Sequence, residues 1–248
     1  MSQALAETSY DLRDIIENIV TEDDEPVDNL FSEKQQTLLK RSLYTSWTPP
    51  PSEDEPQPRR KFLAAANVGI FFALHEQPLV PDFFLSLDVE PHQNWYAKEH
   101  RTYFVWEFGK VPELVLEIVS NRKGKELTGK FKDYARMGVN YYVVYDPQKH
   151  LGKEALCVYE LGFGKRYRPR KDYQLPDLGL SLKLWQGEFE GHKNTWLRWL
   201  DAKGRLIPTG EERALEAEKR AARAEAEVAK LRAELANRTR KPAKKRTK

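Results

Sequence analysis

The sequence predicts an α/β fold, more narrowly an α+β mixed sheet with flanking helices, followed by an extended C-terminal helix. The nearly continuous apolar run Leu114–Val119 is typical of a strand buried on both faces. The helix-favouring segment Lys125–Met137 separates it from a second apolar run, Tyr141–Tyr145. Strand, helix and strand in this order form a unit that is usually parallel and right-handed. The segment Glu211–Ala236 lacks Gly and Pro and is dominated by Ala, Glu, Arg, Lys and Leu, as in a long solvated helix.

The amino-acid composition limits the domain size and the classes of protein that this chain could form. The 248 residues can form one good-sized domain with appendages or two small domains, and 40% hydrophobic residues with 11% aromatic residues are enough for a packed core. The single cysteine, Cys157, excludes an intrachain disulfide and a Cys-rich zinc site, which fits a reducing compartment. The N-terminal residues lack the basic and apolar regions of a signal peptide, and no run reaches the roughly 18 apolar residues of a membrane span. We therefore expect a cytoplasmic protein that does not bind membranes.

The first 60 residues predict a helix and a linker. The start of the chain is polar and acidic. Ser32, followed by Gln35 three residues later, matches a capping box and predicts a helix from about Ser32 to Ser46. The segment SWTPPPSEDEPQPRRK that follows is rich in proline and charge, which predicts an extended linker.

Residues 61–206 predict the main domain. Short apolar runs bounded by turn residues indicate strands, and Gly138 is a suitable C-terminal stop for the helix before it. A glycine-containing turn joins two of the later runs into a predicted hairpin. Besides the two strands already named, the predicted strands are Phe62–Ala66, Val68–Leu74, Asp82–Val89, Glu154–Leu161, Arg166–Arg170, Leu180–Trp185 and Trp196–Leu200.

The C-terminal part predicts a helix over 207–236 and a disordered basic tail over 237–248. A heptad pattern along the helix allows a coiled coil and hence a homodimer, although its N-terminal half offers only alanines. The tail holds seven Lys or Arg and no acids, so removing it from the net charge of +3 leaves −4 on the rest. Such a tail suits contacts with DNA phosphates. The candidates for these contacts are Lys241, Lys244, Lys245 and Arg246.

Two acids within apolar runs are the main candidates for chemistry. Asp82 opens one run, and Glu117 lies inside LVLEIV, where an unpaired buried carboxylate would cost several kcal/mol. A functional role accounts for Glu117 better than a structural one, whereas Pro81-Asp82 alone is also common turn chemistry. Phosphodiester hydrolysis needs charge neutralised on the phosphate and a water made nucleophilic, and Mg²⁺ held by one or two carboxylates provides both.

A lysine on the predicted helix completes the candidate site. Glu126, Lys130 and Tyr134 fall on one helical face at i, i+4 and i+8, so Lys130 could orient or deprotonate a water. The same pattern could be a plain solvated stripe. Ser120 could line the site or cap the next segment, and Glu33 fits either a contact with metal or water or a favourable interaction with the helix dipole. We expect catalytic Asp82, Glu117 and Lys130, with Glu126, Ser120, Glu33 and Tyr134 as accessory candidates.

With these residues the chain resembles the PD-(D/E)XK nuclease superfamily and, within it, the bacterial Uma-type family of restriction-endonuclease-like proteins. The likeness covers roughly Phe62 to Leu184 and rests on Pro81-Asp82, VPELVLEIVS, the Glu126–Lys130–Tyr134 helix and GVNYYVVYDP. It implies a restriction-endonuclease-like core, Mg²⁺ or Mn²⁺ at Asp82 and Glu117, and DNA as substrate.

The chain departs from the superfamily pattern at two positions. The usual lysine follows the acid by two residues, and here Val119 occupies that position. The resemblance implies that Lys130 takes over the role from the helix. Asn140 stands where an acid is typical before the aromatic pair.

Three function classes follow from the sequence. The first is a Mg²⁺-dependent DNA endonuclease, and the second is an inactive nuclease-fold protein that binds nucleic acid or acts as an adaptor. The third, a structural coiled-coil protein, accounts only for Glu211–Ala236. The five histidines lie singly, without metal-ligand spacing. There is neither a GxxxxGK[ST] phosphate loop nor a GxSxG elbow, which disfavours P-loop NTPases and α/β-hydrolases.

Overall fold

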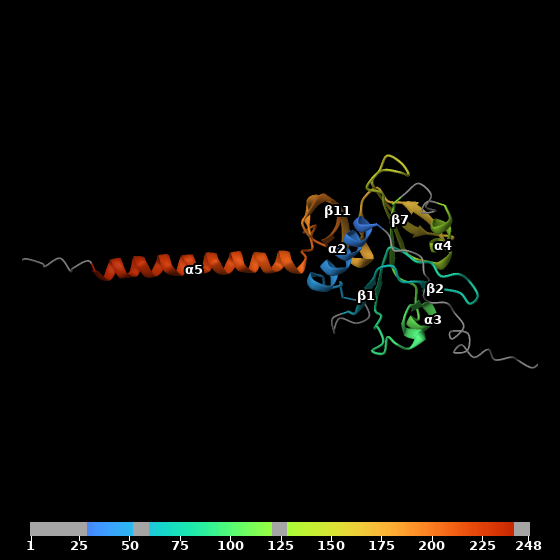
Figure 1. Cartoon of the computed structure of the whole chain (residues 1–248), viewed down its shortest axis with the longest axis horizontal. Coiled ribbons are helices and arrows are strands. Elements are labelled where there is room, and N and C mark those ends of the chain that lie inside the picture. Colours follow the sequence, from blue (N-terminus) through green and yellow to red (C-terminus); the bar gives the residue numbers. More distant parts are fainter. Residues whose placement is uncertain (1–28, 52–59, 121–127, 241–248) are drawn as a thin grey trace, which may run out of the picture. The chain divides into compact units, whose positions relative to one another are not determined.

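A mixed six-stranded sheet forms the centre of the main body (Figure 1). The computed structural model describes residues 29–51, 60–120 and 128–240, and side chains up to residue 236. The chain divides into two compact units between Ile207 and Pro208. In spatial order the sheet contains β1 (Phe62–Ala65), β3 (Phe83–Leu87), β5 (Leu114–Ile118), β6 (Tyr141–Tyr145), β7 (Leu156–Gly162) and β8 (Arg166–Pro169).

The predicted strand–helix–strand unit is confirmed at the centre of this sheet. β5 and β6 pair in parallel, with Leu114 opposite Tyr141, and every other neighbouring pair in the sheet is antiparallel. The helix between them, α4 (Gly129–Met137), ends at Gly138, whose φ of 102° lies in the left-handed region. Glycine adopts this conformation without a steric penalty, so Gly138 ends the helix as predicted.

The alternation of side chains divides the core into two layers. On β5, Leu116 packs into one layer together with Phe83, whereas Val115 packs into the other together with Phe84. Successive side chains of a strand point to opposite faces. Glu117 therefore lies on the same face as Val115, which is the face that carries α4.

The first face is covered by α2 (Leu30–Ser46) and by a second, three-stranded sheet. A buried glutamine joins the two, because the Gln35 side chain donates to the Leu197 carbonyl at 2.9 Å and accepts from the Leu197 amide at 2.9 Å. Two strands of this sheet pair as a hairpin and are longer than the predicted strands Leu180–Trp185 and Trp196–Leu200, because polar residues continue the pairing beyond the apolar runs. The sheet consists of β9 (Gln174–Leu175), β10 (Leu180–Phe189) and β11 (His192–Asp201).

The second face is covered by α4 and by a short parallel pair, β2 (Ile70–Phe71) and β4 (Tyr103–Phe104). The strand predicted over Val68–Leu74 is thus reduced to two residues, since the chain leaves the extended conformation for turns on either side. The short elements that the sequence did not predict are β4, β9, α3 (Val105–Phe108), η1 (Lys98–His100) and η2 (Pro176–Leu178).

The start of α2 differs from the prediction. Asn29 is the N-cap, and its side-chain oxygen accepts from the Ser32 amide at 3.1 Å. Ser32 is fully buried in the first turn. The predicted capping box is therefore wrong, because Gln35 is engaged with Leu197 instead of the helix terminus.

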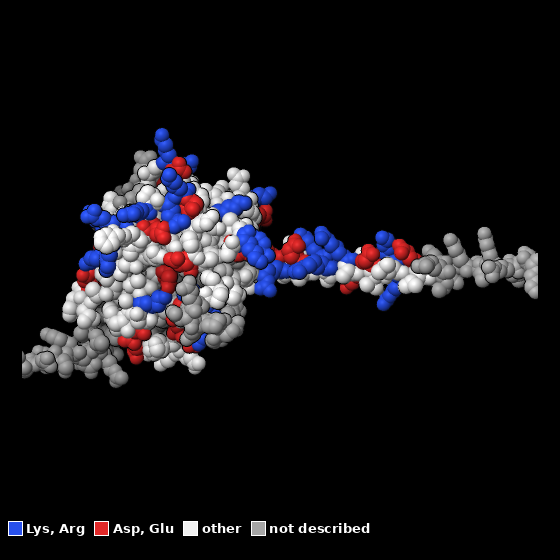
Figure 2. Space-filling view, turned by 180° about the vertical axis from the view of Figure 1, so that it is seen from behind, with Lys and Arg blue, Asp and Glu red and all other residues white. Residues whose placement is uncertain are grey.

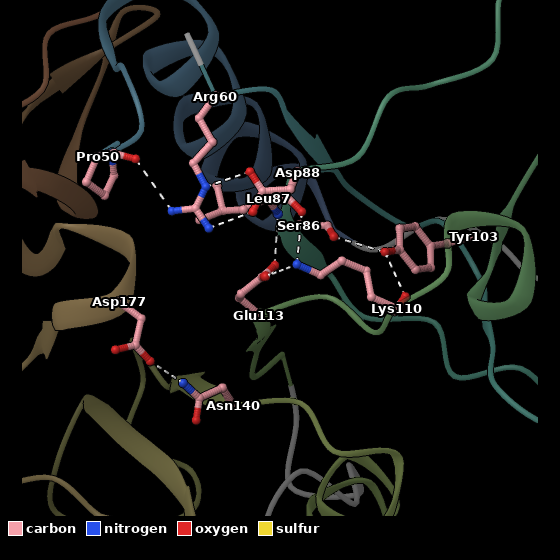
Figure 3. Close-up of polar contacts among 10 residues, drawn as sticks. All are labelled: Pro50, Arg60, Ser86, Leu87, Asp88, Tyr103, Lys110, Glu113, Asn140 and Asp177. Atoms are coloured by element: carbon pink, nitrogen blue, oxygen red, sulfur yellow. Dashed lines mark hydrogen bonds and ion pairs between the residues drawn. The ribbon is translucent and has the colours of Figure 1, made fainter. Parts of the chain in front are cut away.

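A polar network fastens the loop after β3 to the start of β5 (Figure 3). Arg60 donates to both carboxylate oxygens of Asp88, each at 2.6 Å. Glu113 accepts from the Leu87 amide at 2.8 Å and forms an ion pair with Lys110. These contacts lie at the opposite end of β3 and β5 from Asp82 and Glu117, so they stabilise the strand pair without entering the candidate site.

The second unit contains the long helix α5 (Gly210–Arg240). Thr209 accepts from the Glu212 amide at 3.2 Å, and Glu212 accepts from the Thr209 amide at 2.8 Å, which is a capping box. Positive and negative side chains are interspersed along the helix (Figure 2). The helix continues through 237–240, so the prediction of a disordered tail is wrong for these four residues. Among the described residues, no helix is long and apolar enough to cross a membrane.

Candidate active site

Asp82 and Glu117 come from neighbouring strands and lie opposite each other. Phe83 of β3 pairs with Leu116 of β5 in antiparallel register, which places the preceding Asp82 across from Glu117. Residues directly opposite in an antiparallel pair share one face of the sheet. Both are buried, with 8% of Asp82 and 1% of Glu117 exposed.

Two side chains from α4 hold the Glu117 carboxylate. Lys130 Nζ donates to Glu117 Oε2 at 2.7 Å, and the Tyr134 hydroxyl donates to Oε1 at 2.9 Å. Their i, i+4 spacing puts both on the helix face that meets the sheet. Tyr134 is fully buried, while the Lys130 side chain is 35% exposed. Lys130 therefore contacts the buried Glu117 carboxylate while part of its own side chain remains accessible to solvent.

The protonation state of Tyr134 follows from its burial beside Glu117. Burial, followed by the charge of Glu117 and the hydrogen bond to it, raises the pKa of the phenol well above its ordinary value. Tyr134 is therefore a neutral hydrogen-bond donor at physiological pH. Its role in the geometry is to fix the orientation of Glu117.

Asp82 is held by a backbone amide and an amide side chain. Its Oδ2 accepts from the Ile118 amide at 2.5 Å, so the residue next to Glu117 also anchors the second acid. Its Oδ1 accepts from Gln36 Nε2 at 3.1 Å. These two hydrogen bonds fix the direction of both carboxylate oxygens.

Gln36 is a site residue that the sequence reasoning missed. It lies on α2 with 4% of its surface exposed, and it also exchanges hydrogen bonds with Asn67 at 3.1 and 3.2 Å. Asn67 in turn donates its backbone amide to the Pro81 carbonyl at 3.2 Å. Gln36 shares a helical stripe with Leu39 and Leu43, and a polar residue on that apolar stripe was the available signal.

The accessory candidates fare differently. Glu33 is in the first turn of α2, and its described partners are Lys34 and Thr37 rather than either acid. Ser120 is exposed just beyond β5. Val119, at the usual lysine position, is 2% exposed and belongs to the apolar layer under α4. Glu126 and the four tail residues Lys241, Lys244, Lys245 and Arg246 lie outside the described residues.

The two carboxylates suit Mg²⁺ better than a metal ion whose ligands all come from the protein. Among the described residues, no group of three or more His, Cys, Asp and Glu could hold a metal ion. Mg²⁺ usually keeps several waters and takes one or two carboxylates together with substrate phosphate. Two oriented carboxylates, Asp82 and Glu117, fit that requirement. Zinc sites of the Cys and His type do not fit.

The sheet, its two flanking helices and the buried acid pair beside a lysine define a restriction-endonuclease-like α/β protein. The family model Uma2, described as a putative restriction endonuclease, matches residues 25–189. The chain belongs to this family, as its sequence motifs predicted. A search of curated proteins gave no match.

Proposed function

We propose that the protein is a DNA endonuclease that hydrolyses phosphodiester bonds with Mg²⁺, for which Mn²⁺ can substitute. The observation that carries the proposal is the meeting of Asp82, Glu117 and Lys130. Asp82 just before β3, Glu117 on β5 and Lys130 on α4 come together, although Asp82 precedes Glu117 by 35 residues in the chain. Membership in the Uma2 family supports the nuclease class.

Each group has a role that its contacts support. Asp82 and Glu117 would hold the cation, which would neutralise charge on the phosphate and lower the pKa of a bound water. Lys130, with its ammonium 2.7 Å from Glu117, would orient the attacking water or stabilise negative charge that develops on the phosphate oxygens. Tyr134 and Gln36 would keep the two carboxylates in position through the hydrogen bonds described above.

The competing function is a nuclease-fold adaptor without catalysis. The observation in its favour is Val119, an apolar side chain where the superfamily places its lysine. The contact between Lys130 and Glu117 weighs against it, because a lysine that approaches the same carboxylate from α4 can replace one from β5.

The direct test is cleavage of supercoiled plasmid by the full-length protein with Mg²⁺, Mn²⁺ or EDTA. Wild type should nick or cut the plasmid in either metal and not in EDTA. Glu117→Gln and Lys130→Ala should each slow cleavage by about two orders of magnitude or more, the usual scale for a group that acts in the transition state. Lys132→Ala, an exposed lysine on the same helix, is the matched control and should cleave like wild type.

Metal binding separates the two functions. In a titration with Mn²⁺, Asp82→Asn and Glu117→Gln should bind more weakly than wild type, while Lys130→Ala should bind normally. Equal residual cleavage in wild type and all variants would indicate a contaminating nuclease. Together with unchanged metal binding, that result would replace the endonuclease with the adaptor.

A further inference from the structure

A large groove lies between α2, the edge strand β1 and the loop that leads to β4. Its volume is about 1220 Å³. Pockets for single small molecules span roughly 300–1000 Å³, so the groove has room for more than one small ligand unit. We call it the aromatic groove, and its aromatic lining includes Tyr44, Phe62, Trp95, Tyr96, His100 and Phe108.

Two of these aromatic rings are unusually open to solvent. Trp95 is 65% and Tyr96 88% exposed, although both line the groove. Beside them, the rings of His92 and His100 stack at 3.7 Å with an interplanar angle of 9°. Large aromatic side chains are usually well buried, so an exposed set beside a groove marks a binding surface.

The charged side chains of the groove are basic. Lys40 and Arg41 border it from α2, and Arg101 borders it from the loop after η1. Arg101 donates to the Tyr96 carbonyl at 3.1 Å, which fixes the guanidinium beside the exposed aromatic pair. Basic groups interleaved with open aromatic rings are the combination that binds single-stranded nucleic acid, through phosphates and base stacking respectively.

Hydrogen bonds link the wall of the groove to the candidate active site. Ala66 and Val68 both line it, and the residue between them is Asn67. Asn67 exchanges hydrogen bonds with Gln36, which in turn donates to Asp82. One chain of contacts thus leads from the groove wall to the first acid.

We propose that the aromatic groove holds unpaired nucleotides of the DNA strand that is cut, with their bases stacked on Trp95 and Tyr96. The inference rests on the proposed endonuclease function and adds the form of the substrate. A base inside a duplex offers neither face for stacking, so the strand must be single or locally opened where it enters the groove. Lys40 and Arg101 supply positive charge for its phosphates, together with Arg41, which also pairs with Glu190 at 3.4 Å.

The test measures binding and contact separately from cleavage. Fluorescence anisotropy with labelled oligothymidylate, in EDTA, should give tighter binding than the matched duplex. Trp95→Ala and Tyr96→Ala should each weaken binding of the single strand by about fivefold or more, the low end for loss of one base stack. Phe163→Ala is the control, because Phe163 is 96% exposed in the turn between β7 and β8 and lies away from the groove lining.

Photocrosslinking locates the contact. Oligonucleotides carrying 5-iodouracil should crosslink to the peptide that contains Trp95 and Tyr96. Crosslinks elsewhere, equal affinity of the two variants and wild type, or no binding of single strands would overturn the groove assignment. Plasmid cleavage with intact binding by both variants would reject the groove and keep the endonuclease. Binding through the groove without any metal-dependent cleavage would reject the endonuclease and keep the groove.

Discussion

Replacing Tyr134 with phenylalanine isolates the hydrogen bond that orients Glu117. The substitution keeps the buried ring, which packs 5.4 Å from the ring of Tyr142, and removes only the hydroxyl. That hydroxyl is 2.9 Å from a carboxylate oxygen of a residue that is 1% exposed. A hydrogen bond to a charged group contributes about 1.5–3 kcal/mol, so the free energy of unfolding should fall by that amount.

The same change should weaken metal binding. Loss of a hydrogen bond that positions a metal ligand typically costs 10–100-fold in affinity. Urea unfolding followed by circular dichroism gives the stability, and calorimetric titration with Mn²⁺ gives the affinity. Plasmid cleavage should fall in step with the metal affinity at low metal concentration.

Tyr103→Phe is the matched control. Tyr103 is 1% exposed, and its hydroxyl contacts the neutral groups Ser86 Oγ at 2.9 Å and the Lys110 carbonyl at 3.0 Å. We expect a decrease of about 0.5–1.5 kcal/mol in the free energy of unfolding and no change in Mn²⁺ affinity. If Tyr134→Phe costs no more stability than Tyr103→Phe and leaves Mn²⁺ binding unchanged, the argument that Tyr134 orients a charged metal ligand is refuted.

Three further predictions concern the rest of the chain. Burial raises the pKa of the Cys157 thiol, so iodoacetamide should alkylate it more slowly in native than in urea-unfolded protein, and equal rates would contradict this. The hydrogen bond from Arg60 lowers the pKa of Asp88, so this pair stabilises the fold above the ordinary carboxyl pKa and loses that effect as pH falls through the lowered value. Because the Asp88 side chain is 44% exposed, the pair contributes less than about 1 kcal/mol to the free energy of unfolding. Between about pH 6 and pH 3, the free energy of unfolding measured in urea should therefore fall slightly less for Asp88→Asn than for wild type. Deleting residues 241–248 should reduce the slope of log DNA affinity against log salt by about 0.9 for each phosphate that the tail neutralises, and an unchanged slope would show that the tail does not touch DNA.

Periodicity was enough to predict the central part of the fold. The apolar runs of β5 and β6 and the glycine after α4 carry strong local signals, and the structure has all three elements. The two-residue strands β2 and β4 carry almost none, because their pairing depends on residues about 33 positions apart. Such pairs are determined by packing on the sheet rather than by local pattern.

The candidate site was predictable in part for the same reason. Glu117 stood out as an acid in an apolar run, and Lys130 followed from helical spacing on the next element. Gln36 was missed because it precedes Asp82 by 46 residues and reaches it from the opposite layer of the sheet. Its only local signal is a polar side chain on an apolar stripe, and Gln35 shows the same signal with a structural role.

The position of Lys130 on α4 changes what controls the distance between ammonium and carboxylate. On a strand, a lysine two residues after the acid would be held near it by covalent geometry alone. Here the 2.7 Å contact depends on how α4 is seated, which is set by Phe131 and Tyr134 against the Tyr142 ring. The distance between Lys130 and Glu117 thus depends on the packing of the hydrophobic layer beneath the helix. Small repacking changes at Phe131 could adjust the proposed chemistry without altering any polar residue of the site.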